Sequence, residues 1–150
     1  MPGTYTQILF HVVFSTKHRQ PWITADVAER LYPYLGGIVR AEGGVLHDVN
    51  GVEDHVHLYL RWRPDESVSN LMRTVKSRSS KWVHETFPSL VDFAWQEGYA
   101  AFSVSKSQEP AVKKYIVAQH EHHQHEDFKA ELLRLLRAHG VAFDETYVFE

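Results

Sequence analysis

The 150-residue chain contains no cysteine. This absence excludes disulfide bonds, thiolate metal ligands and a cysteine nucleophile, and it is consistent with a cytoplasmic location. The sequence also lacks any run approaching the roughly 20 apolar residues that a membrane span needs. Residues 1–5 do not open a signal peptide. We therefore expect a cytoplasmic protein with no membrane partner.

An excess of positive charge is missing as well, because 16 Lys and Arg stand against 19 Asp and Glu, for a net charge of −3. Nucleic-acid binders are often strongly basic, so the overall balance argues mildly against DNA. The distribution is uneven, however. Between Arg61 and Lys81 there are six basic and two acidic residues, whereas the other 17 acidic residues lie elsewhere, six of them after residue 121. The composition therefore permits a local basic patch.

The remaining composition is that of an ordinary globular protein, with 43% hydrophobic and 23% charged residues. We find no internal repeat, no low-complexity tract and no linker rich in Gly, Ser or Pro. A chain of this length is long enough to bury a hydrophobic core. Residues 1–150 are therefore expected to form a single domain.

Periodicity predicts the order strand, helix, strand, strand, helix, strand and two helices. The predicted strands cover residues 7–14, 45–52, 54–62 and 99–104. The predicted helices run from Thr24 to Gly43, from Ser67 to residue 85, from Pro110 through Gln119, and from Phe128 to Gly140. This order favours an α+β fold of ferredoxin-like character, with an antiparallel sheet and helices packed on it.

The strand predicted at 54–62 carries the first candidate site. Apolar residues occupy every second position of this strand, so that one face is apolar and the other presents His55, His57, Tyr59 and Arg61. Histidines at i and i+2 of a strand point the same way and can share one metal ion. The motif alone is weak, because about 0.8 His-x-His pairs are expected by chance in a chain with 11 histidines.

Two further pairs of this spacing lie in HEHHQHED at 120–127, where a helix would point residues i and i+2 apart. We interpret that run as a solvated helix end or loop. His11, on the first predicted strand, is interpreted as a packing residue.

Several collinear segments resemble a known family. They are YTQILFHVVFSTKHR at 5–19, DHVHLYL at 54–60, SVSNLMRTVKSRSSKWVHE at 67–85, FAWQEGYAAFSVSKSQ at 93–108 and VKKYIVAQHEHH at 112–123. Together they resemble the single-tyrosine transposases of small bacterial insertion sequences, whose His-hydrophobic-His (HUH) strand binds metal. Relatives associated with repetitive extragenic palindromes share much of the pattern.

The resemblance implies the HUH endonuclease fold and places the family's functional residues on this chain. The metal-binding histidines correspond to His55 and His57, the nucleophilic tyrosine to Tyr115, and a further polar metal ligand to Gln119. On a helix, residues 115 and 119 share one face, so both can reach one ion. The pattern alone also allows other interpretations. Tyr115 can be an ordinary aromatic of the apolar helix face, and Gln119 an amide on the helix surface.

The implied activity is metal-dependent cleavage and strand transfer of single-stranded DNA in transposition. A tyrosine attacks the phosphate and leaves a 5′-phosphotyrosine and a free 3′-hydroxyl, so the strand can be rejoined without ATP. Imidazole, amide and phosphate ligands suit Mg²⁺ or Mn²⁺ better than a closed zinc site. The resemblance also implies hairpins at the element ends as DNA partners, and a homodimer.

The helix at 67–85 is the candidate DNA-binding element. Its basic side chains, which can neutralise phosphates, are Arg73, Lys76, Arg78 and Lys81. The alternative interpretation is a solvated helix face.

Two other functions are compatible with parts of the sequence. Two-histidine phosphoesterases need a pair of His-x-Thr/Ser motifs, of which only His84-Glu-Thr86 is present. A domesticated transposase that binds hairpin DNA or RNA without cutting is the stronger alternative, although the complete set of predicted site residues argues against it.

Overall fold

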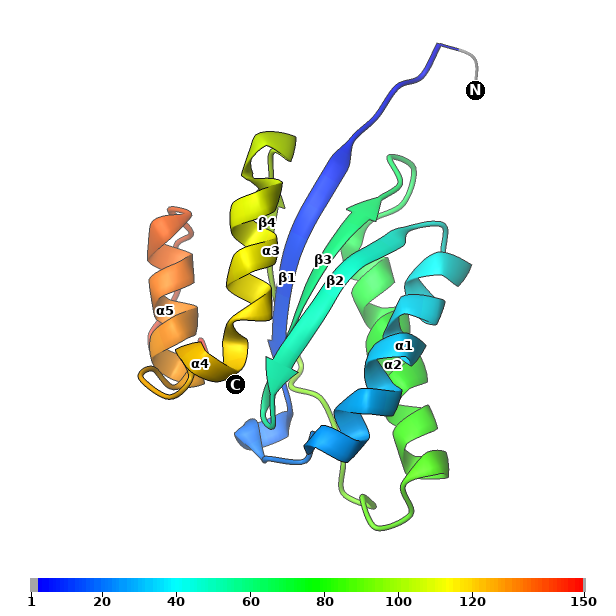
Figure 1. Cartoon of the computed structure of the whole chain (residues 1–150), viewed down its shortest axis with the longest axis vertical. Helices are drawn as coiled ribbons and strands as arrows, with labels where there is room; N and C mark the ends of the chain where they lie inside the picture. Colours follow the sequence, from blue (N-terminus) through cyan, green and yellow to red (C-terminus); the bar gives the residue numbers. More distant parts are fainter. Residues whose placement is uncertain (1–2, 150) are drawn as a thin grey trace.

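An antiparallel sheet of four strands forms the centre of the molecule in the computed structural model, which describes residues 3–149 (Figure 1). The strands lie in the order β2-β3-β1-β4. They are β1 (Ile8–Ser15), β2 (Val45–Val52), β3 (His55–Trp62) and β4 (Ala100–Val104). All three pairings are antiparallel. This is the predicted α+β, ferredoxin-like arrangement, and each strand lies within two residues of its predicted bounds.

Helices cover both faces of the sheet (Figure 1). One face carries α1 (Ala25–Ala41) and α2 (Val68–Thr86), and the other carries α3 (Glu109–Val117), α4 (Gln119–His122) and α5 (Phe128–Ala138). Short 3-10 turns, η1 (Lys17–Arg19) and η2 (Lys106–Gln108), follow β1 and β4. None of the helices within residues 3–149 is long and apolar enough to cross a membrane.

Local chemistry explains where the second and last major helices begin. The hydroxyl of Ser67 accepts a hydrogen bond from the Asn70 backbone N–H at 3.0 Å, which caps α2 as predicted. The Asp127 carboxylate caps α5 in the same way through the Ala130 N–H at 2.9 Å. After α1, Gly43 adopts φ 93°, a conformation that glycine reaches without strain.

The helix predicted from Pro110 through Gln119 is shorter than expected. Helix α3 ends at Val117, Ala118 has ψ 13°, and Gln119 begins the separate turn α4. Neither glycine nor proline marks this break, so the sequence pattern gave no signal of it. Tyr115 and Gln119 therefore lie on two consecutive helices rather than on one face of a single helix.

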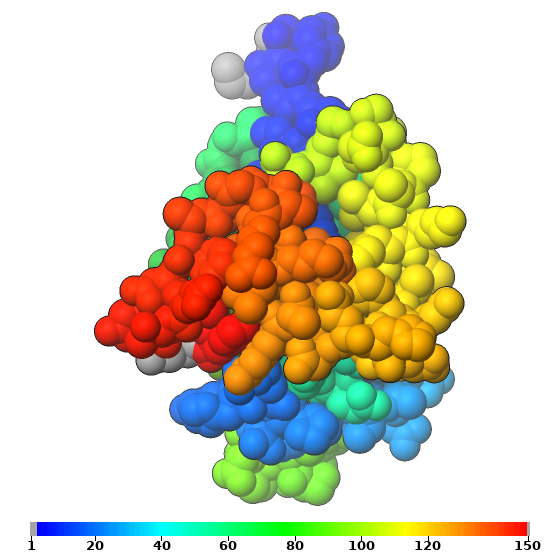
Figure 2. Space-filling model, turned by 90° about the vertical axis from the view of Figure 1, so that its left-hand side faces the viewer, coloured from blue at the N-terminus to red at the C-terminus, as the bar shows by residue number. Residues whose placement is uncertain are grey.

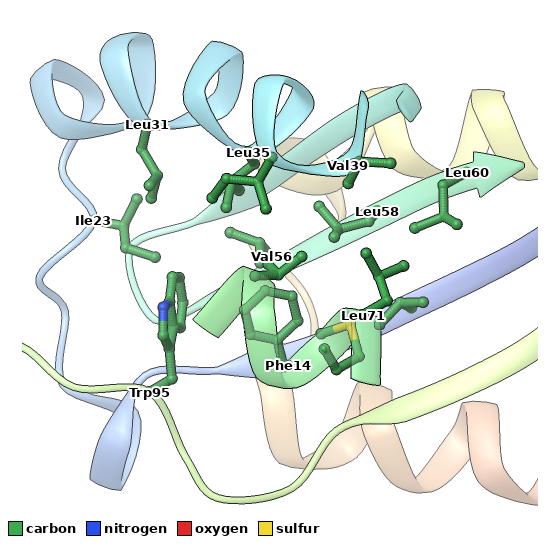
Figure 3. Close-up of a cluster of buried hydrophobic side chains, with 14 of the residues drawn as sticks. Phe14, Ile23, Leu31, Leu35, Val39, Val56, Leu58, Leu60, Leu71 and Trp95 are labelled. Atoms are coloured by element: carbon green, nitrogen blue, oxygen red, sulfur yellow. The ribbon is translucent and has the colours of Figure 1, made fainter. Parts of the chain in front are cut away.

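The main core lies between the sheet and the helices α1 and α2 (Figure 3). From β3, Val56, Leu58 and Leu60 point to this side, where they meet residues such as Leu35 of α1 and Leu71 of α2. On the other face of β3, His55, His57 and Tyr59 are equally buried and face α3, α4 and α5, whereas Arg61 is exposed. The period of two thus separates an apolar face from a polar one.

Two smaller clusters fix the helices on the polar side. From α5, Phe128, Leu132, Leu135 and Leu136 pack against Val13 and Phe102 of the sheet. From α3, Ile116 packs against Leu9 and Tyr59. Figure 2 shows α3 (yellow) and α5 (orange) side by side on this face of the molecule. Helix α3 is therefore held against β1 and β3, and α5 against the neighbouring strands β1 and β4.

Gly51 of β2 provides a test of the sheet next to these histidines. A Cβ at Gly51 would lie 2.1 Å from the carbonyl oxygen of His55, so Gly51→Ala must displace the β2–β3 connection. We expect a loss of roughly 1–3 kcal/mol in the free energy of unfolding. Urea denaturation followed by circular dichroism measures it.

Gly37→Ala is the matched control, because a Cβ there meets no atom within 4 Å and Gly37 lies inside α1. This substitution should stabilise the protein by roughly 0.5–1 kcal/mol, since alanine favours a helix over glycine. Equal stability of the two variants would contradict the close packing at Gly51.

Candidate metal centre and active site

The two histidines of β3 point their Nε2 atoms at one place. The Nε2 atoms of His55 and His57 lie 3.0 Å and 3.1 Å from Oε1 of Glu131. Their Nδ1 atoms have other partners, with His55 Nδ1 at 2.7 Å from Asp54 and His57 Nδ1 at 2.8 Å from His11. Metal-binding histidines are typically oriented in this way, by a hydrogen bond on the nitrogen that does not bind the ion.

A third imidazole completes the cluster. His123 Nε2 lies 2.9 Å from the same Oε1 of Glu131. One ligand atom from each of His55, His57, His123 and Glu131 lies within 4.8 Å of all the others. Three imidazole nitrogens and a carboxylate oxygen form a donor set that suits a divalent transition ion. The residues present thus fit a divalent metal ion.

Tyr115 and Gln119 meet the other oxygen of the same carboxylate. Gln119 Nε2 donates to Glu131 Oε2 at 3.0 Å, and the Tyr115 hydroxyl donates to it as well. Gln119 Oε1 lies 3.2 Å from His55 Nε2. The structure therefore brings together the four residues predicted as nucleophile and metal ligands, Tyr115, His55, His57 and Gln119. Tyr115 reaches the histidines of its own chain.

Strand β2 holds the end of α3 in this position. The Asn50 side-chain N–H group donates to the carbonyl oxygens of Ile116 at 3.0 Å and Val117 at 3.3 Å. These carbonyls belong to the last turn of α3, where carbonyl groups lack the i+4 partner that they would have inside a helix. The contact therefore fixes both the tyrosine just before this turn and the glutamine just after it.

The electrostatic balance differs between the two histidines of β3. Burial lowers the pKa of His57 to about 4, despite its hydrogen bond to Glu131, so this imidazole is neutral at pH 7. Burial also lowers the pKa of His55, but hydrogen bonds to Asp54 and Glu131 outweigh burial and raise it to about 8. Burial and the neighbouring His57 lower the pKa of His11 to about 3.

The pKa values of Glu131 and Tyr115 are shifted in opposite directions. Burial raises the pKa of Glu131, but hydrogen bonds from His123, His55 and His57 outweigh it and hold the pKa far below its usual range. The group is therefore an ionised carboxylate. Burial and the contact with this carboxylate raise the pKa of Tyr115 above its usual range, so the phenol keeps its proton in the free protein.

Sequence reasoning missed two members of the cluster. The run at 120–125 was interpreted as solvated, which is correct for the exposed His120 and His125 but wrong for His123, whose side chain is 10% exposed. Glu131 was not singled out, yet it lies between Phe128 and Leu135 on the apolar face of α5. A charged residue on such a face was the available signal. His11 is buried as expected, but it also contacts His57.

The four basic residues predicted to bind DNA lie on α2, on the opposite face of the sheet from Tyr115 (Figure 1). Lys76 is partly buried, and its ammonium group donates to the carbonyls of Gln96, Glu97 and Gly98. The other contacts are Arg73 with Asn70 at 3.2 Å, Arg78 with Glu42 at 3.2 Å and Lys81 with Glu85 at 3.9 Å. The structure thus separates this helix from the metal centre.

Arg73 and Lys76 line a surface cavity of about 510 Å³, together with Trp95, Gln96 and Tyr99. Trp95 is largely buried, as predicted, and its indole N–H donates to Ser79 at 2.9 Å. The cavity therefore offers two basic groups and the exposed ring of Tyr99.

The fold and the site together define a ferredoxin-like protein with a candidate metal centre and a tyrosine beside it. The family model described as "Transposase IS200 like" matches residues 4–119. The chain therefore belongs to the IS200-like transposase family.

Relatives of known sequence or structure agree with this assignment. The ISDra2 transposase TnpA of Deinococcus radiodurans is 25% identical over 124 residues, which cover 79% of this chain and 89% of that protein. A solved structure described as a transposase of D. radiodurans R1 matches with a TM-score of 0.66 at 24% identity, covering 79% of this chain and 95% of the other.

The structure of a REP-associated tyrosine transposase bound to a REP hairpin matches with a TM-score of 0.61 at 13% identity. The match covers 82% of this chain and 73% of the other. At this identity the similarity establishes the fold.

The cluster predicts that metal stabilises the folded protein. Mn²⁺ should raise the unfolding temperature, because it binds the assembled ligands and not the unfolded chain. At a free metal concentration 100 times Kd, the gain is about 2.7 kcal/mol. Differential scanning calorimetry with and without Mn²⁺ measures it.

His57→Ala should abolish this shift, whereas His47→Ala, which removes an exposed histidine of β2, should leave it intact. An equal shift in the two variants would place the bound ion elsewhere.

Proposed function

We propose that the chain cuts and rejoins single-stranded DNA, with Tyr115 as the nucleophile and a divalent ion held by His55, His57 and Gln119. One observation carries the proposal. The tyrosine hydroxyl and the histidine Nε2 atoms meet the two oxygens of one buried carboxylate, Glu131. A phosphate at this place can therefore contact both the nucleophile and an ion bound by these histidines.

The proposed step is a transesterification at phosphorus. A bond forms between Tyr115 Oη and the phosphorus, while the bond from phosphorus to the 3′ oxygen of the preceding nucleotide breaks. Glu131 Oε2 orients the phenol by accepting its hydrogen bond, the phenol proton is lost to solvent as the bond to phosphorus forms, and the 3′ oxygen takes a proton from solvent. The products are a 5′-phosphotyrosine and a free 3′-hydroxyl, and the reverse step joins a new strand.

His123 and Glu131 extend the proposed ligand set beyond the residues that the family resemblance supplies. The bound ion would polarise the scissile phosphate and offset its negative charge. Of the two ions predicted, Mn²⁺ suits a set dominated by imidazole nitrogens better than Mg²⁺, which prefers oxygen ligands.

Hairpins of single-stranded DNA are the proposed substrates, by analogy with the REP hairpin bound to the REP-associated relative. The homodimer implied by the resemblance stays a prediction. The ring centres of Tyr115 and His57 lie 5.7 Å apart within one chain, which supports a proposal that the tyrosine acts with the histidines of its own subunit.

The covalent intermediate gives the direct test. Single strands from the flanks of the gene, labelled at the 3′ end, should leave the label on the protein after incubation with Mn²⁺, as seen on a denaturing gel. The adduct should be absent with EDTA and in Tyr115→Phe, which lacks the attacking oxygen.

Tyr147→Phe is the matched control, because Tyr147 is 61% exposed. It should form as much adduct as the unaltered chain. Cut product without adduct would mean that water is the nucleophile. Binding without cleavage of any flanking strand would favour the domesticated DNA-binding protein.

A second experiment tests the cavity on α2. We propose that Arg73 contacts a DNA phosphate, since it lines the cavity beside Lys76. Arg73→Ala should weaken binding of the hairpin and reduce the slope of log K against log salt by about 0.7–0.9, the value for one phosphate contact. Fluorescence anisotropy over a salt series measures both quantities.

Arg40→Ala is the control, because Arg40 is an exposed residue near the end of α1. If both variants keep the slope of the unaltered chain, α2 is a solvated face and DNA binds elsewhere.

A further inference from the structure

Helix α5 brings charged groups to the nucleophile from outside the segment that matches the family. The match ends at residue 119, and α5 covers Phe128–Ala138. The apolar residues of α5 pack against the sheet, and polar side chains of the same helix contact Tyr115. Glu131 and Arg134, one helical turn apart, both contact the tyrosine hydroxyl.

Arg134 forms a hydrogen bond with the attacking atom of the proposed reaction. Its Nη2 donates to Tyr115 Oη at 2.8 Å, and its guanidinium carbon lies 5.5 Å from the centre of the tyrosine ring. The phenol oxygen is therefore placed between the carboxylate of Glu131 and the guanidinium of Arg134. The positive charge of Arg134 opposes the rise in the pKa of Tyr115 that burial and Glu131 cause.

Neighbouring residues hold this guanidinium in place. Glu126 accepts from Arg134 Nη2 at 3.1 Å and from Nε at 3.2 Å, and His122 Nε2 lies 2.9 Å from Nη2. Among residues 3–149, Nη1 has no hydrogen-bond partner, and the side chain is 44% exposed. His122 and Glu126 also line a surface hollow of about 480 Å³. A ligand can therefore reach the guanidinium from solvent.

We propose that Arg134 is a further catalytic residue that binds a non-bridging oxygen of the scissile phosphate. The proposal rests on the proposed function, in which phosphorus bonds to Tyr115 Oη. A group 2.8 Å from that oxygen is within reach of the phosphate oxygens when phosphorus arrives there. Arg134 keeps all its protons in the step, while negative charge builds on the phosphate as the Oη–P bond forms and the P–O3′ bond breaks.

A guanidinium suits this task better than an ammonium group. It is planar, permanently charged and carries several N–H donors in a fixed arrangement. While Nη2 and Nε stay on Tyr115 and Glu126, Nη1 remains to donate to the phosphate.

Arg134 also has a structural role as a link between Glu126 and Tyr115, and the test must separate the two roles. Removing the charge of the phosphate does so. A single strand with a neutral methylphosphonate at the cleavage position keeps the strand's shape but offers Arg134 no anionic partner. A purely structural arginine would not distinguish this strand from the normal one.

The first measurement is the rate of adduct formation in a single turnover with Mn²⁺. Arg134→Ala should slow it by about 100-fold, the typical loss when one charge-stabilising donor is removed. Arg134→Lys should recover part of the rate. Arg137→Ala, one turn further along α5 and paired with the exposed Glu145, should stay within about twofold of the unaltered chain.

The second measurement is binding in a Tyr115→Phe background, where no cleavage occurs. The protein with Arg134 should bind the phosphate strand about tenfold more tightly than the methylphosphonate strand, and Arg134→Ala should reduce this preference. Circular dichroism confirms that each variant is folded.

An unchanged rate in Arg134→Ala, or an unchanged preference for the phosphate strand, would overturn the assignment. If the unaltered chain forms an adduct that requires Tyr115, such a result leaves the proposed function intact. If the unaltered chain forms no adduct, the proposed function and the role of Arg134 both fail.

Discussion

One buried carboxylate organises the site. Glu131 is fully buried and ionised, a state that is costly in a protein interior unless the charge is paired and hydrogen-bonded. It meets this condition through three imidazoles on one oxygen and a phenol and an amide on the other. These partners come from β3, α3, α4 and the turn that follows α4. Every element that carries a residue of the candidate metal centre or the tyrosine beside it is therefore linked to the same two oxygen atoms.

The sheet makes this arrangement rigid. Strand β3 is buried on both faces, so its apolar side chains lock it into the core while His55 and His57 have little freedom to turn. The Nδ1 partners, Asp54 and His11, fix the direction of the two rings. Asn50 fixes the end of α3. The candidate ligands are therefore held in place before any ion arrives, which lowers the entropy lost when one binds.

The fold and the centre of the site were largely predictable, because they depend on local periodicity. The alternation at 54–62 identifies a strand with both histidines on one face, and Ser67 marks the start of α2. The peripheral members were not, because they depend on the path of the chain. The unmarked break at Ala118 and the short turn α4 bring His123 back to the cluster, and only tertiary packing decides which histidine of a polar run is buried. The separation of α2 from Tyr115 likewise follows from sheet topology, which no local pattern encodes.

The side chains of the candidate site come from two segments of the chain. Residues 4–119, which match the family, contain the proposed nucleophile and the ligands proposed from the resemblance. The later segment supplies a carboxylate that raises the pKa of Tyr115 and a guanidinium that lowers it. Neither group bonds to phosphorus in the proposed step, yet both set the charge around the atom that does. The charge around the proposed nucleophile therefore depends on a segment of the chain outside residues 4–119.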